Sequence, residues 1–118
     1  MLLALLAISQ YPAVAGYNAI YYAPKNNVVG GSYGQETKED AMKKARKQCK
    51  SRRGRGCKNV MWSNRCSSLY VSPGSGKYGY GAAYGDSRAE ANKNAYKQCN
   101  ACQLLLIITQ LAPGSPWA

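Results

Sequence analysis

The chain has 118 residues, and its sixteen Lys and Arg outnumber five Asp and Glu to give a net charge of +11, with no histidine at all. A chain of this length holds one domain with a modest hydrophobic core, and the lack of histidine removes the commonest general base and metal ligand. Every carboxylate falls at one of two expected helix starts, where capping explains it. We therefore predict no catalytic residue, no metal ligand and no cofactor, and we expect the chain not to be an enzyme. The carboxylates are Glu36, Glu39, Asp40, Asp86 and Glu90.

Residues 1–15 have the pattern of a signal peptide. Leu2 to Ile8 is an apolar run, and Ala13-Val14-Ala15 supplies the small residues that precede signal-peptidase cleavage, here before Gly16. The run is too short to span a bilayer, and the alternative is a buried N-terminal strand. We expect a secreted or periplasmic protein whose mature chain has no transmembrane segment.

Residues 16–65 predict two strands, a helix and a third strand. The first two strands are joined by Pro24-Lys25-Asn26-Asn27, which has hairpin-turn chemistry. Thr37 followed by Asp40 is typical of a capped helix start, and small side chains then recur every four residues, on one helical face. The strands are Tyr17–Ala23, Val28–Tyr33 and Asn59–Ser63, and the small helical stripe is Ala41, Ala45 and Cys49.

Residues 66–111 repeat this pattern at an offset of about fifty residues. The helix start returns as Ser87-x-x-Glu90, and Lys47-Gln48-Cys49 returns as Lys97-Gln98-Cys99. The repeat predicts a single domain over residues 16–111 made of two units, 16–65 and 66–111, followed by a flexible C-terminal tail, 112–118. The second-unit strands are Cys66–Ser72, Lys77–Tyr84 (joined to the first around Pro73-Gly74-Ser75-Gly76) and Leu104–Thr109, and the stripe is Ala91, Ala95 and Cys99.

The fold class that these elements predict is α+β. Two ββαβ units related by a pseudo-twofold would form antiparallel-rich sheet with both helices packed on it. In each unit the second strand has a face of small residues, on which we expect the helix to dock. The continuous apolar run of the last strand favours burial on both of its faces. The small faces are Gly30, Ser32 and Gly34 in the first unit, and Gly79, Gly81, Ala83 and Gly85 in the second.

Aromatic residues on the strands are the next candidates for function. Tyr78, Tyr80 and Tyr84 share the strand face opposite the glycines, and Trp62 lies on the third strand. Such residues could stack on sugars or on single-stranded nucleic acid. More often they are core, and we predict core positions for the tyrosine stripe and for Trp62.

Several short motifs together resemble the bacterial family described as domain of unknown function DUF4189. The resemblance spans roughly residues 17–109 and implies a small secreted or periplasmic protein, like the exported mycobacterial members. It implies no activity and no catalytic residue. The family pattern has a further cysteine after the last strand, where this chain has Leu111. The motifs are Tyr17-Asn18-Ala19-Ile20, Ser32-Tyr33-Gly34, Gly56-Cys57-Lys58-Asn59-Val60, Asn64-Arg65-Cys66 and Ser87-Arg88-Ala89-Glu90-Ala91.

The five cysteines suit disulfides in an oxidising compartment. The repeat pairs Cys49 with Cys57 and Cys99 with Cys102, which leaves Cys66 unpaired. A redox role for the Cys99-x-x-Cys102 loop is disfavoured because a helix C-terminus does not activate a thiolate. A four-cysteine zinc site stays open as an alternative, although the first spacing is wide for one.

The most distinctive surface feature is a basic segment on the first helix and the loop after it. The simpler interpretation is that the helix face is merely solvated and that the loop only adds solubility. The functional hypothesis is an anion-binding surface for a cell-envelope polymer, a lipid headgroup or an acidic protein, with nucleic acid a weaker candidate. The candidate anion-binding residues are Lys43, Lys44, Arg46, Lys47, Lys50, Arg52, Arg53, Arg55 and Lys58.

The sequence thus favours an exported, non-enzymatic binding module that contacts an anionic partner. The alternative is a secreted inhibitor, an immunity-type protein or a host-directed effector that acts through a protein–protein interface. Salt separates the two classes, because binding to a phosphate-rich polymer weakens steeply with ionic strength and a hydrophobic interface does not.

Overall fold

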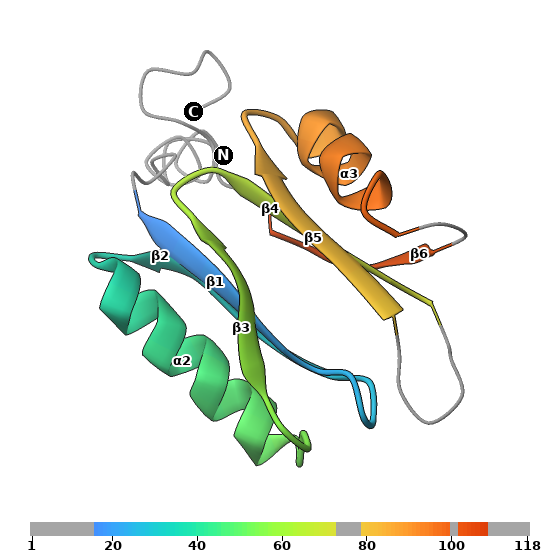
Figure 1. The fold of residues 1–118 in the computed structure, drawn as a ribbon. Helices are drawn as coiled ribbons and strands as arrows, with labels where there is room; N and C mark the ends of the chain where they lie inside the picture. The colour runs from blue at the N-terminus through green and yellow to red at the C-terminus, as the bar shows by residue number, and fades with distance from the viewer. Residues whose placement is uncertain (1–15, 73–78, 100–101, 109–118) are drawn as a thin grey trace, which may run out of the picture.

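The computed structural model describes residues 16–72, 79–99 and 102–108, and they contain the predicted elements in the predicted order (Figure 1). The predicted signal peptide, the predicted turn at 73–76, Lys77, Tyr78, Thr109 and the predicted C-terminal tail lie outside the described residues. The elements are β1 (Tyr17–Ala23), β2 (Val28–Gln35), α2 (Lys38–Ser51), β3 (Lys58–Ser63), β4 (Cys66–Ser72), β5 (Gly79–Gly85), α3 (Arg88–Tyr96) and β6 (Gln103–Ile108).

The strands form two three-stranded sheets, one in each unit. Their orders are β2-β1-β3 and β5-β4-β6, and every pairing is antiparallel. The first strand of each unit is therefore central, and the strand that follows the helix lies at an edge. The sheets face each other, with α2 outside one and α3 outside the other (Figure 1). The predicted α+β fold of two ββαβ units is confirmed, with its strands divided between two sheets.

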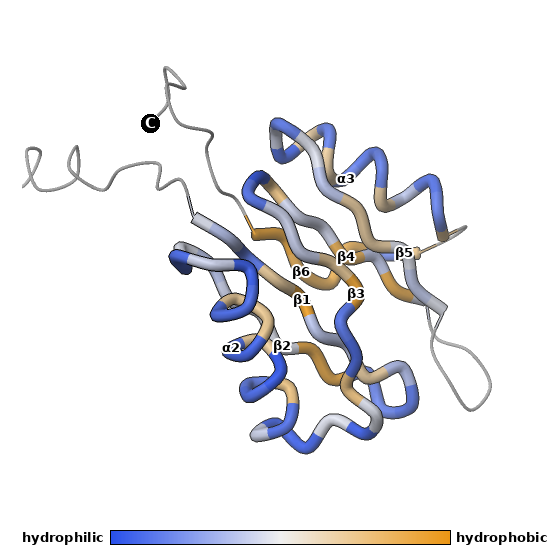
Figure 2. Tube along the Cα trace, turned by 60° about the vertical axis from the view of Figure 1, so that its left-hand side comes forward, coloured by the Kyte–Doolittle hydropathy of each residue, from blue (hydrophilic) through white to orange (hydrophobic). Residues whose placement is uncertain are grey.

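The main hydrophobic core lies between the two sheets. Ile20 and Tyr22 of β1 meet Leu69 and Val71 of β4, and the Tyr22 ring packs edge-on against Tyr80 at 5.6 Å between centroids. Alternation along a strand sends every second side chain into this layer, and Figure 2 shows the hydrophobic segments concentrated there. Because both units contribute to the layer, each unit buries its inner face against the other.

Each helix packs on the small face of its sheet, as predicted, although Gly34 and Gly79 of the predicted faces are exposed and have no helix atom within 4 Å of an added Cβ. Ala41, Ala45 and Cys49 are completely buried. A Cβ added to Gly30 would meet the backbone of Ala45 and Cys49, and the Ser32 hydroxyl donates to the backbone oxygen of Ala41 at 2.6 Å. In the second unit Gly81 and Gly85 stand equally close to α3. Small residues on both partners therefore set the distance between helix and sheet.

Enlarging the stripe should overpack this contact. Ala45→Leu and Ala95→Leu are each expected to lower the free energy of unfolding by about 1–3 kcal/mol, because both alanines are completely buried. Urea denaturation measures the loss. Ala89→Leu on the exposed side of α3 is the control, and equal stabilities for all three variants would contradict close docking.

The helix starts are capped as the sequence predicts. The Thr37 side chain accepts from the Asp40 backbone N–H at 3.0 Å, and the Ser87 hydroxyl accepts from the Glu90 N–H at 3.1 Å. Glu90 also accepts from the Asp86 N–H at 2.7 Å. These bonds satisfy backbone groups that a helix start leaves unpaired.

A buried polar network joins the two units where β3 passes into β4. The Asn18 amide donates to the backbone oxygen of Arg65 at 2.6 Å, and its oxygen accepts from the Ser67 hydroxyl at 2.6 Å. The hydroxyls of Ser63 and Ser67 lie 2.7 Å apart. Hydrogen bonding offsets the cost of burying these groups, and the network fixes the crossover between the sheets.

Three predictions of burial are wrong. Tyr84, predicted in the core with the tyrosine stripe, is 50% exposed, whereas Tyr80 packs against the core. The last strand was expected to be buried on both faces, yet Leu104 is 41% exposed and Leu105 is 36% exposed. Trp62, predicted in the core, is 42% exposed and lies beside Lys38 and Tyr17. The reason is the same for all three: β6, β3 and β5 are edge strands, because β4 and β1 take the central positions.

Candidate functional site

The exposed side of α2 carries a dense group of cations. Its small stripe turns toward the sheet, so the residues between the stripe positions face solvent. All the predicted cations of this helix are exposed, and they extend to its C-terminal end. They are Lys43, Lys44, Arg46, Lys47 and Lys50.

The loop after α2 is tied back to the fold and carries two more cations beside the helix end. The Gly54 N–H donates to the backbone oxygen of Cys49 at 2.9 Å. From the β1–β2 turn, the Asn26 side chain donates to the Arg53 oxygen at 2.9 Å and accepts from the Arg55 N–H at 3.0 Å. We call the resulting surface the basic face, and its residues are Lys43, Lys44, Arg46, Lys47, Lys50, Arg53 and Arg55.

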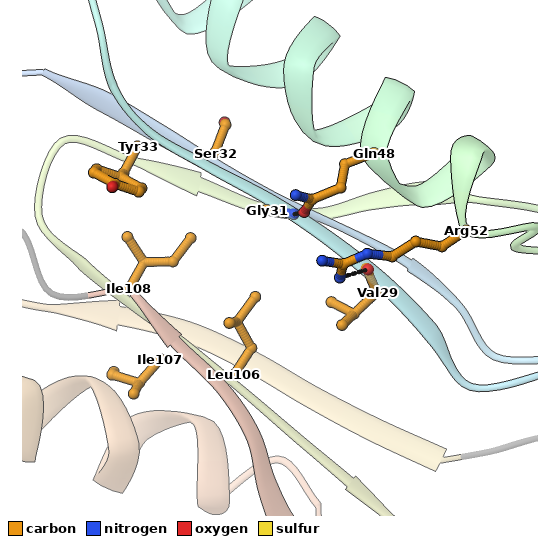
Figure 3. Close-up of a pocket in the computed structure, with 9 residues that line it drawn as sticks. All are labelled: Val29, Gly31, Ser32, Tyr33, Gln48, Arg52, Leu106, Ile107 and Ile108. Carbon is orange, nitrogen blue, oxygen red and sulfur yellow. Dashed lines mark hydrogen bonds between the residues drawn. The ribbon is translucent and has the colours of Figure 1, made fainter.

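Two predicted members of the set point elsewhere. Lys58 pairs with Tyr22 across β3 and β1, and its ammonium lies 5.1 Å from the Tyr80 ring centroid, on the side of the sheet away from α2. The Arg52 side chain reaches the free edge of β2, where it donates to the Val29 backbone oxygen at 2.9 Å (Figure 3). The structure thus keeps the five helix cations together on the exposed side of α2, with Arg53 and Arg55 exposed on the loop beside its end, and it separates Arg52 and Lys58 from them.

No ion pair joins a cation of the basic face to an acid within the described ranges. The one ion pair found there joins Arg65 and Asp86 at 3.0 Å, outside the basic face. The acids of α2 lie in its first turn, and Asp40 is within about 6 Å of Lys43 and Lys44 along the helix. About 15 Å separates Asp40 from Lys50, more than the screening length of about 8 Å at physiological salt, so the acids do not screen the C-terminal part of the basic face. The negative end of the helix dipole lies beside Lys50, which favours cations there.

The structure contains both predicted disulfides, Cys49–Cys57 and Cys99–Cys102. The first closes the basic loop onto the end of α2. Cys66 belongs to neither disulfide, and its side chain is completely buried at the start of β4. No group of three or more His, Cys, Asp or Glu within residues 16–72, 79–99 and 102–108 is placed to hold a metal ion. The helices described there are also too short and too polar to cross a membrane.

Removing the first disulfide should cost more stability than removing the second. Cys49→Ser with Cys57→Ser frees a loop with sequence separation 8, and we expect a loss of about 2.5 kcal/mol through the unfolded chain. Cys99→Ser with Cys102→Ser frees a loop with sequence separation 3, and the expected loss is about 2 kcal/mol. Urea denaturation of the two double variants checks the order, and a larger loss for the second pair would contradict it.

The repeated glutamines have a role that was not predicted from the sequence. The Gln48 side-chain oxygen accepts from the Gly31 N–H at 2.6 Å (Figure 3), and the Gln98 oxygen accepts from the Ala82 N–H at 3.2 Å. Both N–H groups lie on edge strands, so each helix covers an open sheet edge with the same side chain. Such covering protects an edge from pairing with another chain. The repeat of Lys-Gln-Cys was the available signal.

Comparison with protein families finds a match over residues 17–107 to a family described as "Domain of unknown function (DUF4189)", in agreement with the resemblance of the motifs. Among solved structures the fold is similar to the NMR structure of Rv1813c from Mycobacterium tuberculosis, with a TM-score of 0.62 and 22% sequence identity. The similarity covers 83% of this chain and 78% of that chain, and at this identity it concerns the fold alone. No match is found among curated proteins.

Proposed function

The chain belongs to the DUF4189 family, a domain of unknown function, and from that premise we propose that it is a non-enzymatic binding module that acts outside the cytoplasm and holds an anionic polymer. The observation that carries the proposal is the basic face, where seven exposed cations lie along α2 and the loop after it and none makes an ion pair with a described residue. Unneutralised charge of one sign raises the local concentration of oppositely charged partners.

The second unit shows that the fold does not require this charge. α3 docks in the same way as α2 but has Asn94 where α2 has Lys44, and Tyr96 where α2 has Arg46. A helix that served only to cover its sheet would need no more cations than α3 has. This asymmetry supports a role for the basic face beyond solubility.

The two disulfides support the proposed location outside the cytoplasm, because such bonds persist in oxidising compartments. The shape of the basic face also favours a polymer. Its cations lie along an exposed helix and a loop rather than around a closed cavity, and lysines on flexible stems suit repeated phosphate or carboxylate groups at varied spacings.

Salt dependence of binding tests the proposal. Fluorescence anisotropy of a labelled polyphosphate chain, titrated with the protein, gives the dissociation constant. If about five phosphates are neutralised, raising salt from about 50 mM to about 200 mM should weaken binding about a hundredfold. A neutral dextran of similar length is the control. No binding at low salt, or affinity that does not change with salt, would contradict the proposal.

A further inference from the structure

An apolar slot opens along one flank of the sandwich, between the edge strand β2 of one sheet and the edge strand β6 of the other. Its cavity volume is about 320 Å³, near the lower end of the range for small-molecule sites. Val29, Gly31 and Tyr33 line it from β2, and Leu106 and Ile108 line it from β6 (Figure 3). We call it the flank slot.

The slot stays open because Gly31 has no side chain. A Cβ added there would lie 3.2 Å from Leu106 Cδ2 and 3.5 Å from Ile108 Cδ1, so a larger side chain would enter the space between the two strands. The corresponding residue of the second unit is Ala82, whose side chain fills the equivalent space, and it is only 7% exposed. Val29 and Leu106 also pack against the inter-sheet core, so the slot is continuous with an apolar interior.

Cations lie on the α2 side of the slot, one in its lining and two in an adjoining groove. The Arg52 guanidinium is held against Val29 at one end. A groove lined by Lys44 and Lys47 adjoins the slot and shares Gly31 and Gln48 with it. Apolar walls and cationic groups thus lie next to each other on one flank.

The opposite flank provides an internal comparison. A groove there is lined by Met61, Ala82 and Tyr84 between β3 and β5, in positions related by the repeat to those of the flank slot. Its cation, Arg65, is paired with Asp86 at 3.0 Å, and Glu90 also lines it. Of the two described flanks, therefore, the one between β2 and β6 combines an apolar slot with cations that make no ion pair to a described acid.

We propose that the flank slot binds an anionic lipid with a single acyl chain. The chain lies between β2 and β6, in contact with Val29, Leu106 and Ile108, and the head group meets Arg52, Lys44 and Lys47. Burial of the chain supplies affinity in proportion to the apolar area covered. The inference extends the proposed function, because it gives part of the same cationic surface a second, amphipathic ligand.

Calorimetric titration of the full chain with dodecyl phosphate, below the concentration at which it forms micelles, tests the inference. Inorganic phosphate and dodecyl maltoside supply the head-group charge alone and the chain alone. We expect dodecyl phosphate to bind at least about tenfold more tightly than either, a difference of about 1.4 kcal/mol. Equal affinity for dodecyl phosphate and inorganic phosphate would overturn the role of the slot.

Two variants locate the ligand. Gly31→Val fills the slot and should weaken dodecyl phosphate binding at least about tenfold, whereas Ala82→Val makes the matching change on the other flank and should leave it unchanged. Arg52→Gln, on an exposed side chain, should weaken dodecyl phosphate but not dodecyl maltoside, and it keeps the test valid if Gly31→Val does not fold. Unchanged binding by Arg52→Gln would overturn the assigned head-group position.

The slot and the proposed function can fail separately. Loss of dodecyl phosphate binding in Gly31→Val with polyphosphate binding intact supports the slot. Native protein that binds polyphosphate but not dodecyl phosphate overturns the slot alone. Native protein that binds dodecyl phosphate but not polyphosphate overturns the anionic polymer and keeps the slot.

Discussion

Gly30→Val is expected to prevent the chain from folding. A Cβ at this position would overlap the backbone of α2 at the Ala45 oxygen and the Cys49 nitrogen. Backbone atoms of a packed helix cannot move aside as a side chain can, so the helix would have to leave its sheet. We expect a loss of more than about 4 kcal/mol, which is most of the stability of a small domain. Far-UV circular dichroism and urea denaturation measure it.

A matched control lies on the equivalent strand of the second unit. Gly79 is exposed, and a Cβ there would meet only the Ser72 hydroxyl, at 3.3 Å. Gly79→Val should therefore change stability by less than about 1 kcal/mol. If Gly30→Val were as stable as Gly79→Val, the close approach of α2 to β2 would be incorrect.

Removing three charges from the outer side of α2 should nearly abolish polymer binding. Lys43, Arg46 and Lys50 lie on one exposed stripe of the helix, away from the Arg52 end of the flank slot. Each cation near an anionic surface contributes about 1 kcal/mol, so the triple change to Gln should weaken polyphosphate binding about a hundredfold at low salt. The salt slope should fall by about two. Anisotropy titrations measure both quantities.

The second helix supplies a control with the same loss of net charge. Arg88, Lys93 and Lys97 of α3 and its C-terminal cap are exposed, and changing all three to Gln should weaken binding much less. Because both triple variants lose three positive charges, a difference between them reports position rather than net charge. Equal weakening would show that polyphosphate responds to total charge, and it would contradict a defined basic face.

The repeated unit could be predicted because its small residues are local and periodic. The recurrence of Ala-x-x-x-Ala-x-x-x-Cys beside a glycine-lined strand indicates a helix docked on a sheet, and the structure places Ala45 and Gly30 in that relation. The order of the strands within each sheet could not be predicted from such local patterns. An apolar run such as Leu104 to Ile108 suits a central strand, yet it lies at an edge because β4 pairs with both of its neighbours.

The candidate site was predicted in part, and Lys58 shows why the remainder was not. In a regular strand Lys58 and Trp62 would share a face, because they are four residues apart. An irregularity in the pairing between Ile20 and Tyr21 places Trp62 opposite Ala19 on the α2 side, and Lys58 opposite Tyr22 on the other side. Sequence alternation does not reveal such a shift.

The flank slot depends on contacts between residues that are still farther apart in the sequence. It forms only when the edge of one sheet comes to lie beside the edge of the other, which brings Gly31 close to Leu106 and Ile108. These residues are far apart in the sequence, and no local pattern connects them. The Lys-Gln-Cys repeat, in contrast, was visible, but the role of its glutamine required knowing which strand edge the helix covers.

Backbone amide NMR shifts recorded while polyphosphate is added to the protein test the central claim most directly. The account predicts that the largest shifts fall in the C-terminal half of α2 and in the loop from Arg52 to Gly56, with small shifts in α3. The largest shifts on α3 or β5, or shifts spread evenly over the chain, would contradict an anion-binding surface on the basic face.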